Sequence, residues 1–316
     1  MVHQGRSPLT GSYDHRVLNP IHLHTLRACV RTRSFAEAAR ELGYTSSAVS
    51  QQMFQLERSV GAALFERSAR SVRPTAVAEQ LAERSGAALG ALSTLEREAA
   101  AMVRGEAGSL RLASFATANA RIVPAALAAV VARRPNAEVQ LDEGEPDEVL
   151  DGVLEGTLDA AVVFDYDRDR RDWPVELHRA ELLTEPFALA VPPGHRFAGQ
   201  AEVDLAEAAT ETWICTRADT AGARSLARLA ADAGFVPRIV FRSNDYGVIR
   251  ELVARELGVA MLPALAWPDG GVRTVALAGR RPFRQVLVLY RPNNTNPMLP
   301  LALDCLEQAC AEFRWD

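Results

Sequence analysis

The amino-terminal quarter of the chain repeats apolar residues at the spacing of amphipathic helices. A first helix is expected after Pro20, because apolar residues then recur every three or four positions. Ser34 and Glu37 have the spacing of a capping box, in which each side chain satisfies a free amide at a helix start. They precede the segment FAEAAREL, and we expect this second helix to end at Gly43.

A third helix is predicted from its N-cap Thr45 to about Ser59. Its apolar residues are spaced 4, 3 and 4 apart and form one face: Val49, Met53, Leu56 and Val60. The opposite face presents polar side chains: Ser46, Ser47, Ser50, Gln51 and Gln55. Two short helices joined by a turn at Gly43 suit a helix-turn-helix, although an ordinary helix pair explains the geometry equally well.

The segment that follows, GAALFERSARSVRPT, helps to decide between a helix-turn-helix and an ordinary helix pair. It places arginines three residues apart among small residues: Arg67, Arg70 and Arg73. Beside the third helix, such a segment predicts a hairpin wing whose guanidinium groups contact the sugar-phosphate backbone of DNA. The wing therefore favours the helix-turn-helix interpretation.

Residues 75–105 predict one long helix whose seam positions alternate in steps of 4 and 3. These positions are Leu81, Ser85, Ala88, Leu92, Leu95, Ala99 and Met102. A heptad seam of this length predicts pairing with a second helix. Burial of a single amphipathic helix within the same chain is the alternative.

From about residue 106, short apolar strands alternate with helices. The expected strands are SLRLASF, AEVQLDEG, LDAAVVF, FALAV, TWICT, RIVF and GVAML, and the expected helices span 120–134, 146–156, a segment near Leu205, 224–233 and 246–256. This alternation predicts parallel sheet covered on both faces. Two such runs predict two α/β lobes with a ligand cleft at the carboxyl ends of their strands. A last helix, from about Met298 to Phe313, is expected to pack on the first lobe.

Composition excludes several classes of protein. The 316 residues are 48% apolar and 24% charged, as in soluble globular proteins. The longest apolar run, 123–132, is far shorter than the roughly 20 residues of a membrane span. Residues 1–19 lack the apolar centre of a secretory signal, so we expect a disordered leader and a cytoplasmic protein.

The candidate reactive side chains are few. All 35 basic residues are arginines, which excludes Schiff-base lysines, Walker-A lysines and Ser-Lys nucleophiles. Cys29, Cys215, Cys305 and Cys310 show no paired or zinc-binding spacing, so we expect buried thiols. No metal site, cofactor or enzyme activity is predicted.

Charge is distributed unevenly along the chain. Residues 20–74 contain eight arginines and four acids, a net charge of +4, and residues 1–19 add +1. Because the whole chain has a net charge of −5, the remainder carries −10. A basic head on an acidic body indicates that only the amino-terminal part approaches phosphates.

The order of these parts resembles the LysR-type transcriptional regulators. The likeness covers about residues 20–313 and is most specific in SFAEAARELGYTSSAVSQQMFQLERSVGAALFERSAR, with weaker matches in GSLRLAS, LEGTLDAAVV and ELGVAMLP. The family usually has Gln where Ser46 stands, a basic residue where Phe54 stands, and L-T-P-A-G where this chain reads PTAVA at 74–78. The resemblance implies an α/β protein with an N-terminal all-α winged helix-turn-helix, a long linker helix and a two-lobed effector domain like a periplasmic binding protein.

The expected domain limits follow from the periodicity of the sequence and from the family resemblance. A leader covers 1–19, the DNA-binding domain 20–78, the linker and dimerisation helix 79–105, and the effector-binding domain 106–316. Within the last, lobe I is expected at 106–164 and 270–316, and lobe II at 165–269.

The DNA contacts are expected from the third helix and the wing. In the major groove, glutamine can pair with adenine and short polar side chains can contact base edges. The expected base contacts are Ser46, Ser47, Ser50, Gln51 and Gln55, and the expected phosphate contacts are Ser34, Arg67, Arg70 and Arg73. Phe54 has two interpretations, contact with a thymine methyl or packing under the wing, and we expect packing.

The effector contacts are expected at the ends of strands. They are Ala116, Thr117, Thr216, Arg217, Asn244 and Asp245. Arg217 suits a carboxylate and Asp245 an amine, so the effector is expected to be a small polar or anionic metabolite. Sensing by Cys215 is disfavoured, because lobe II holds no second cysteine to resolve an oxidised thiol.

The expected partners are double-stranded DNA and a second copy of the chain. A homodimer paired through the linker helix presents two heads, so its DNA site should be an imperfect palindrome. The resemblance further implies a homotetramer. The alternative function is an α/β small-molecule-binding module or enzyme whose N-terminal helices serve only for assembly.

Overall fold

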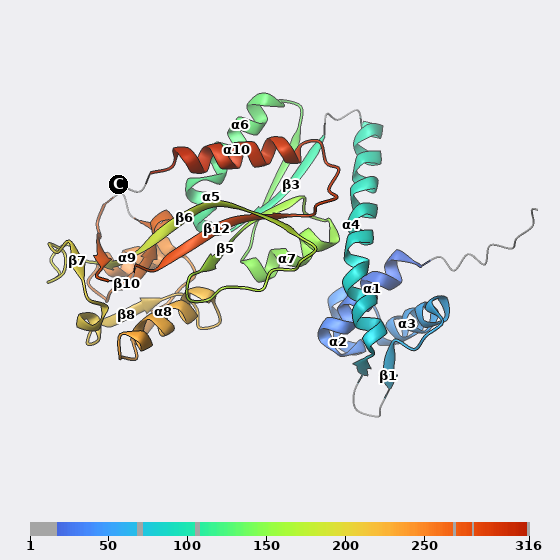
Figure 1. The fold of residues 1–316 in the computed structure, drawn as a ribbon, viewed down its shortest axis with the longest axis horizontal. Helices are drawn as coiled ribbons and strands as arrows, with labels where there is room; N and C mark the ends of the chain where they lie inside the picture. The colour runs from blue at the N-terminus through green and yellow to red at the C-terminus, as the bar shows by residue number, and fades with distance from the viewer. Residues whose placement is uncertain (1–17, 68–71, 105–107, 268–269, 280, 315–316) are drawn as a thin grey trace, which may run out of the picture. The chain divides into compact units, whose positions relative to one another are not determined.

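The computed structural model describes residues 18–67, 72–104, 108–267, 270–279 and 281–314 (Figure 1). It divides into two compact units, residues 1–89 and 90–316, with the boundary inside one long helix. Most of the predicted leader, and Arg70 of the predicted wing, lie outside the described residues.

The first unit consists of short helices and a two-stranded hairpin. Its elements are α1 (Pro20–Thr32), α2 (Phe35–Leu42), α3 (Ser46–Val60), β1 (Phe65–Arg67), β2 (Val72–Pro74) and the amino-terminal half of α4 (Ala76–Arg104). Strands β1 and β2 pair antiparallel, which forms the predicted hairpin. Val49, Met53 and Leu56 of α3 are fully buried, as their spacing predicted.

The helix ends of this unit follow from individual residues. Ser34 caps α2, because its Oγ accepts a hydrogen bond from the Glu37 amide at 3.3 Å. The reciprocal half of the predicted capping box is wrong, since the Ser34 amide donates to Thr32 Oγ1 and Glu37 pairs with Arg40. Gly43 ends α2 with a φ of 69°, a conformation that glycine adopts without strain.

The second unit is built on a twisted sheet of eight strands. The strands of this unit are β3 (Ser109–Ser114), β4 (Glu138–Glu143), β5 (Ala160–Tyr166), β6 (His178–Val191), β7 (Glu202–Val203), β8 (Thr212–Cys215), β9 (Arg238–Arg242), β10 (Ala260–Pro263), β11 (Arg273–Leu277) and β12 (Phe283–Tyr290). The sheet order is β4-β3-β5-β12-β6-β11-β7, with β10 also pairing with β6, while β8 and β9 form a separate parallel pair.

The prediction of purely parallel sheet is wrong. Strands β3, β4 and β5 pair in parallel, but β12 pairs antiparallel with both β5 and β6, and β10 and β11 pair antiparallel with β6. Strand β6 is 14 residues long and reaches both lobes, whereas only its last five residues, FALAV, were expected as a strand. Strands β7, β11 and β12 were not predicted.

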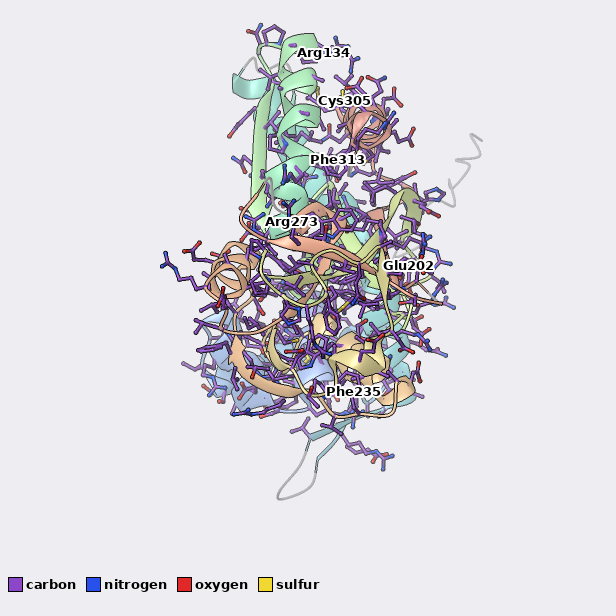
Figure 2. The ribbon with its side chains drawn as sticks, turned by 90° about the vertical axis from the view of Figure 1, so that its left-hand side faces the viewer. Arg134, Glu202, Phe235, Arg273, Cys305 and Phe313 are labelled. Atoms are coloured by element: carbon purple, nitrogen blue, oxygen red, sulfur yellow. The ribbon has the colours of Figure 1, made fainter. Side chains whose placement is uncertain are left out.

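Helices cover both lobes of the sheet. They are α5 (Ala116–Arg121), α6 (Val123–Arg133), α7 (Pro146–Glu155), α8 (Ala221–Asp232), α9 (Tyr246–Ala254) and α10 (Leu299–Glu312), with 3-10 turns at Leu205–Ala208 and Ala264–Ala266. The helix expected over 120–134 is two helices that meet at Ile122, just before Pro124. Helix α10 runs beside α6 (Figure 1), and its Cys305, labelled in Figure 2, accepts a hydrogen bond from Arg133 of α6.

The carboxyl-terminal half of α4 is anchored within the second unit. Arg97 forms an ion pair of 3.0 Å with Asp159, whose side chain is fully buried. The second oxygen of Asp159 accepts from the Arg111 amide at 2.9 Å. Gly156, at φ 80°, lies so close to Gly90 that a Cβ there would be 2.7 Å from the Gly90 Cα. These contacts hold the helix against the turn between α7 and β5.

The predicted heptad seam of α4 is only partly accessible. Leu81 and Ser85 are half-buried and buried within the first unit, whereas Leu92 and Leu95 are 40% and 60% exposed. Ala88 and Ala99 are also exposed, and the Met102 side chain lies outside the described residues. Over the described parts of the chain, no helix is long and apolar enough to cross a membrane.

Candidate functional site

The polar face of α3 is accessible over two helical turns. Ser46, Ser47, Gln51 and Gln55 are exposed and Ser50 is half-buried. Thr45 caps the helix by accepting from the Ala48 amide at 3.2 Å, so the amino end of α3 is fixed. The buried apolar face attaches α3 to the head, which leaves this polar face free to contact a partner.

The predicted phosphate contacts lie in the loop before α2 and on the hairpin. Ser34 is half-buried and uses its hydroxyl oxygen as the α2 cap. Arg73 is exposed on β2. Arg67 belongs to β1, where its backbone pairs with Val72, and Arg70 falls outside the described residues.

Two side chains near this face have roles that the sequence did not indicate correctly. Phe54 is 55% exposed, so the expectation that it packs under the wing is wrong. The aromatic contact inside the head is instead made by Phe35 and Phe65, whose ring centres are 5.1 Å apart. Gln52 accepts a hydrogen bond of 2.6 Å from the buried Thr25, which joins α3 to α1.

The body contains a cleft made of two adjoining hollows that share Thr216, Gly222 and Tyr246. Each encloses about 350 Å³, including space open to solvent. One hollow is mainly apolar and is lined by Phe187, Ile214, Leu226, Leu229, Ile249 and Met261. The other is polar, with Thr117, Glu145, Tyr166, Thr220, Asn244 and Arg284 in its lining.

Four of the six predicted effector contacts line the polar hollow. They are Ala116, Thr117, Thr216 and Asn244. Arg217 and Asp245 do not line either hollow. The exposed Arg217 side chain lies 3.9 Å from Asp219, while Asp245 caps α9 by accepting from the Gly247 amide at 2.7 Å.

The cleft is also lined by a charged side chain that was not predicted from the sequence, Arg284. This side chain is 1% exposed, and its Nε donates to the fully buried Glu185 at 2.6 Å. A second nitrogen donates to Thr117 Oγ1 at 2.8 Å, and the rings of Phe115 and Phe164 lie 4.8 and 4.9 Å from the guanidinium. The other oxygen of Glu185 accepts from the Leu265 amide.

A signal for this pair was present in the sequence. Glu185 and Arg284 each stand two residues before an apolar run, FALAV and VLVLY, and they face each other in the register of β6 and β12. The pairing could not be found without knowing that these two strands are neighbours.

Burial shifts the protonation of the groups around Arg284. It raises the pKa of Glu145, with Arg284 opposing the shift, and it raises the pKa of Glu185 against the same opposing charge. Burial also raises the pKa values of Tyr166 and Tyr246, so both phenols stay protonated at neutral pH. The cleft therefore offers hydroxyl donors and acceptors beside a neutralised ion pair.

The cysteines show no sign of activation. All four are buried as free thiols. Burial raises the pKa of Cys29 to about 12 and also raises that of Cys215, whereas a reactive thiol needs a lowered pKa. Across the described residues, no group of three His, Cys, Asp or Glu side chains could hold a metal ion.

Comparison with known proteins gives matches along almost the whole chain. Residues 21–79 match the family described as bacterial regulatory helix-turn-helix protein, lysR family, and residues 104–311 match the LysR substrate binding domain. The small neutral protease regulatory protein of Streptomyces coelicolor is 31% identical over 300 residues, which cover 92% of this chain and 91% of that protein. The transcriptional regulator CbbR of Xanthobacter flavus is 29% identical over 95% of this chain and 90% of its own length.

Solved structures share the fold. Full-length OxyR of Pseudomonas aeruginosa, a point variant, covers 94% of this chain and 96% of its own, with a TM-score of 0.60 at 21% identity. Full-length CbnR in complex with its target DNA covers 92% of this chain and 99% of its own, with a TM-score of 0.51 at 24% identity.

Proposed function

This chain belongs to the LysR family of bacterial transcriptional regulators, and from this we propose how it functions. It is a DNA-binding regulator with an N-terminal helix-turn-helix and a C-terminal effector-binding domain. Members of this family regulate transcription and are not enzymes in general, and we propose that this chain likewise has no catalytic activity. We also propose that it acts in the cytoplasm.

The head binds DNA through α3 and the hairpin. Helix α3 enters a major groove, where Ser46, Ser47, Ser50, Gln51 and Gln55 approach base edges. Ser34, Arg67, Arg70 and Arg73 contact phosphates and fix the register of the head. The support for this assignment is the exposed polar face of α3, together with the +4 charge of residues 20–74.

The cleft of the body binds the effector. Its lining includes Ala116, Thr117, Thr216 and Asn244, and we retain Arg217 and Asp245 as residues of the rim. Glu145 and Arg284 are the charged side chains of the lining, and Arg284 is already paired with Glu185. An anion would gain little from a guanidinium that is neutralised in place. Of the polar and anionic classes, the cleft therefore favours a small polar molecule with an apolar part that fits the adjoining hollow.

The exposed stretch of α4 supports a homodimer. Leu92 and Leu95, which are 40% and 60% exposed, present apolar surface on this helix. Pairing with a second α4 would bury this surface and bring two heads to an imperfect palindrome, and further pairing gives a tetramer. The proposed limits remain 20–78 for the head, 79–105 for the linker helix and 106–316 for the effector domain, with lobes 106–164 plus 270–316 and 165–269.

One observation supports this proposal most: the same chain has a cleft with a polar and an apolar end and a helix, α3, whose polar face is exposed. Effector and DNA are then coupled, and each changes the affinity for the other by the same factor, typically 5- to 150-fold. We would screen uncharged and anionic metabolites by the melting temperature of the full chain, because a ligand of the folded state raises it. The hit would then be titrated during DNA binding.

The expected result is a hit whose effect on both melting temperature and DNA affinity is lost in Thr216→Val and kept in Thr210→Val. Thr216 lines both hollows, whereas Thr210 is exposed elsewhere on the body. A hit that stabilises the chain without altering DNA affinity would contradict the proposal and support a binding module or enzyme whose head serves only for assembly.

A further inference from the structure

Phe54 is a large apolar side chain on the accessible side of α3. It is 55% exposed, while the residues that attach α3 to the head, Val49, Met53 and Leu56, are fully buried. No aromatic ring of the described residues contacts Phe54, since the ring pair of the head is formed by Phe35 and Phe65. The core of the head therefore does not require an aromatic side chain at this position.

The neighbours of Phe54 place it on the proposed base-reading face. Gln51 precedes it by three residues and Gln55 follows it directly, and both are exposed. Residues three apart lie on one side of a helix. Phe54 is also about 4.5 Å from Gln51 along the helix axis, at 1.5 Å per residue. Successive base pairs are about 3.4 Å apart, so the two side chains reach positions one or two base pairs from each other.

The chemistry of a phenyl ring restricts what it can contact there. It has no hydrogen-bond donor or acceptor, and covering the polar edge of a base without a partner is unfavourable. In the major groove, guanine, cytosine and adenine present donors and acceptors, whereas thymine adds a C5-methyl group. The thymine methyl is the apolar group that gains from contact with a ring.

From these contacts we propose that Phe54 is a specificity-determining residue that contacts the C5-methyl group of a thymine, within about two base pairs of the base contacted by Gln51. This inference rests on the proposed docking of α3 in the major groove. It gives Phe54 a role in base preference and none in phosphate binding, because the side chain carries no charge.

The experiment uses the full chain and a library of random duplexes. Selected duplexes should have a thymine at one fixed position in each half of the site. In one selected duplex, each thymidine is then replaced in turn by deoxyuridine, which removes only the methyl group. Loss of that contact should weaken binding about fourfold at the Phe54 position and leave other positions nearly unchanged.

Four proteins are compared on these duplexes. The wild type and Phe54→Leu should distinguish thymine from uracil at that position, because both keep an apolar side chain. Phe54→Ala should bind the two duplexes equally. Ile21→Ala on α1 is the matched control: its apolar side chain is 53% exposed, it belongs to none of the proposed DNA contacts, and its loss should leave the thymine preference intact. Since Phe54 is exposed, its replacement should not disturb folding, which unchanged helical circular dichroism would verify.

Each outcome decides the question. If uracil is tolerated at every position by the wild type, or if Phe54→Ala still prefers thymine, the thymine contact is wrong while DNA binding by the head stands. If the full chain selects no duplex at all, the proposed docking of α3 fails, and the Phe54 assignment with it.

Discussion

At the residue scale, the cleft depends on how one guanidinium is held. Arg284 uses Glu185 and Thr117 as hydrogen-bond acceptors and lies between the rings of Phe115 and Phe164. A fully buried charge is tolerated only with such partners. The pair therefore fixes the position of the guanidinium and cancels its charge, which leaves hydroxyl groups and Glu145 to interact with a ligand.

Glu145 should make the stability of the effector domain depend on pH. Burial raises the pKa of Glu145 in the folded state, because the charged carboxylate is poorly solvated there. The contribution of Glu145 to folding stability is therefore fully present below its pKa in the unfolded chain, and it is lost as pH rises through its pKa in the folded chain. Glu145→Gln should therefore raise the midpoint of urea unfolding at pH 7, and the difference from wild type should vanish below about pH 4. The exposed Glu138→Gln on β4 is the control and should show no such difference. A Glu145→Gln protein that is less stable at pH 7 would argue against this interpretation.

Gln51 and Arg73 should affect DNA binding in different ways. Gln51→Ala should relax base preference, with a cost of about 1–3 kcal/mol on the preferred duplex only. Arg73→Ala should weaken binding to all duplexes about equally and reduce the magnitude of the salt slope by roughly 1. Binding titrations on the preferred and a shuffled duplex separate the two effects. Equal losses on both duplexes from both changes would refute the assigned roles.

The site was only partly predictable at this scale. The exposed face of α3 follows from local helical spacing, so Ser47, Gln51 and Gln55 could be placed from the sequence alone. Phe54 was misjudged, because an apolar residue was assumed to be buried although the α3 core was already filled by Val49, Met53 and Leu56. Arg217 was chosen because it follows the end of a strand, but the direction of its side chain depends on a loop that the sequence pattern does not describe.

At the element scale, α4 changes its environment along its length. The amino-terminal half packs in the head through Ala78, Ala82 and Leu89. The carboxyl-terminal half is held by Arg97 and Asp159, and Ser93 donates to the Gly156 carbonyl at 3.2 Å. Between these attachments, the exposed leucines are the part of the helix available to another chain.

Removing the Arg97 ion pair should destabilise the second unit. Arg97→Met would remove the ion-pair partner of the buried Asp159 carboxylate, which would keep the Arg111 amide and Asn294 as hydrogen-bond donors and the charge of Arg291 nearby. A buried charge that loses its partner costs about 3–5 kcal/mol, and the 12% exposure of Arg97 places the expected loss at the lower end. Urea unfolding measures it, with the exposed Arg84→Met on the same helix as control. Equal stability of the two variants would show that the ion pair does not anchor α4.

The elements themselves were predicted unequally. Helices α2 and α3, whose caps and periodicity are clear, and helix α10 agree with the structure to within one or two residues at most ends. The helix over 120–134 was expected as one, because alanine-rich periodicity continues across the break at Ile122. Strand β12 was missed and the sheet was taken as parallel, since strand direction depends on pairing between distant segments, which hydrophobic runs do not encode.

At the scale of the whole molecule, the chain joins a basic head to an acidic effector domain. The sequence predicted this division from charge and from the change of periodicity near residue 106. The unit boundary between residues 89 and 90 lies earlier, because the end of α4 makes its contacts with the effector domain. The oligomer that the family resemblance implies requires a second chain, so its test must be made in solution.

A substitution at Leu95 tests the proposed dimer. Leu95→Glu should place like charges in the seam of two paired helices and shift the protein toward monomers, which analytical ultracentrifugation would detect. Leu95 is 60% exposed, so the fold of a single chain should not change. Val131→Glu, at another exposed apolar position, serves as the control. Unchanged sedimentation of the Leu95→Glu protein would exclude pairing through this part of α4.

The central claim, that this chain is a sequence-specific DNA-binding regulator, is tested most directly by the salt dependence of DNA affinity. The full chain would be titrated onto a duplex carrying the region upstream of its own gene and onto a shuffled duplex of equal length, at 50 and 200 mM salt. We expect the first duplex to bind more tightly, and we expect affinity to fall about 10³-fold between the two salt concentrations if about six phosphates are contacted. Affinity that is absent, unaffected by salt, or equal for the two duplexes would contradict this account.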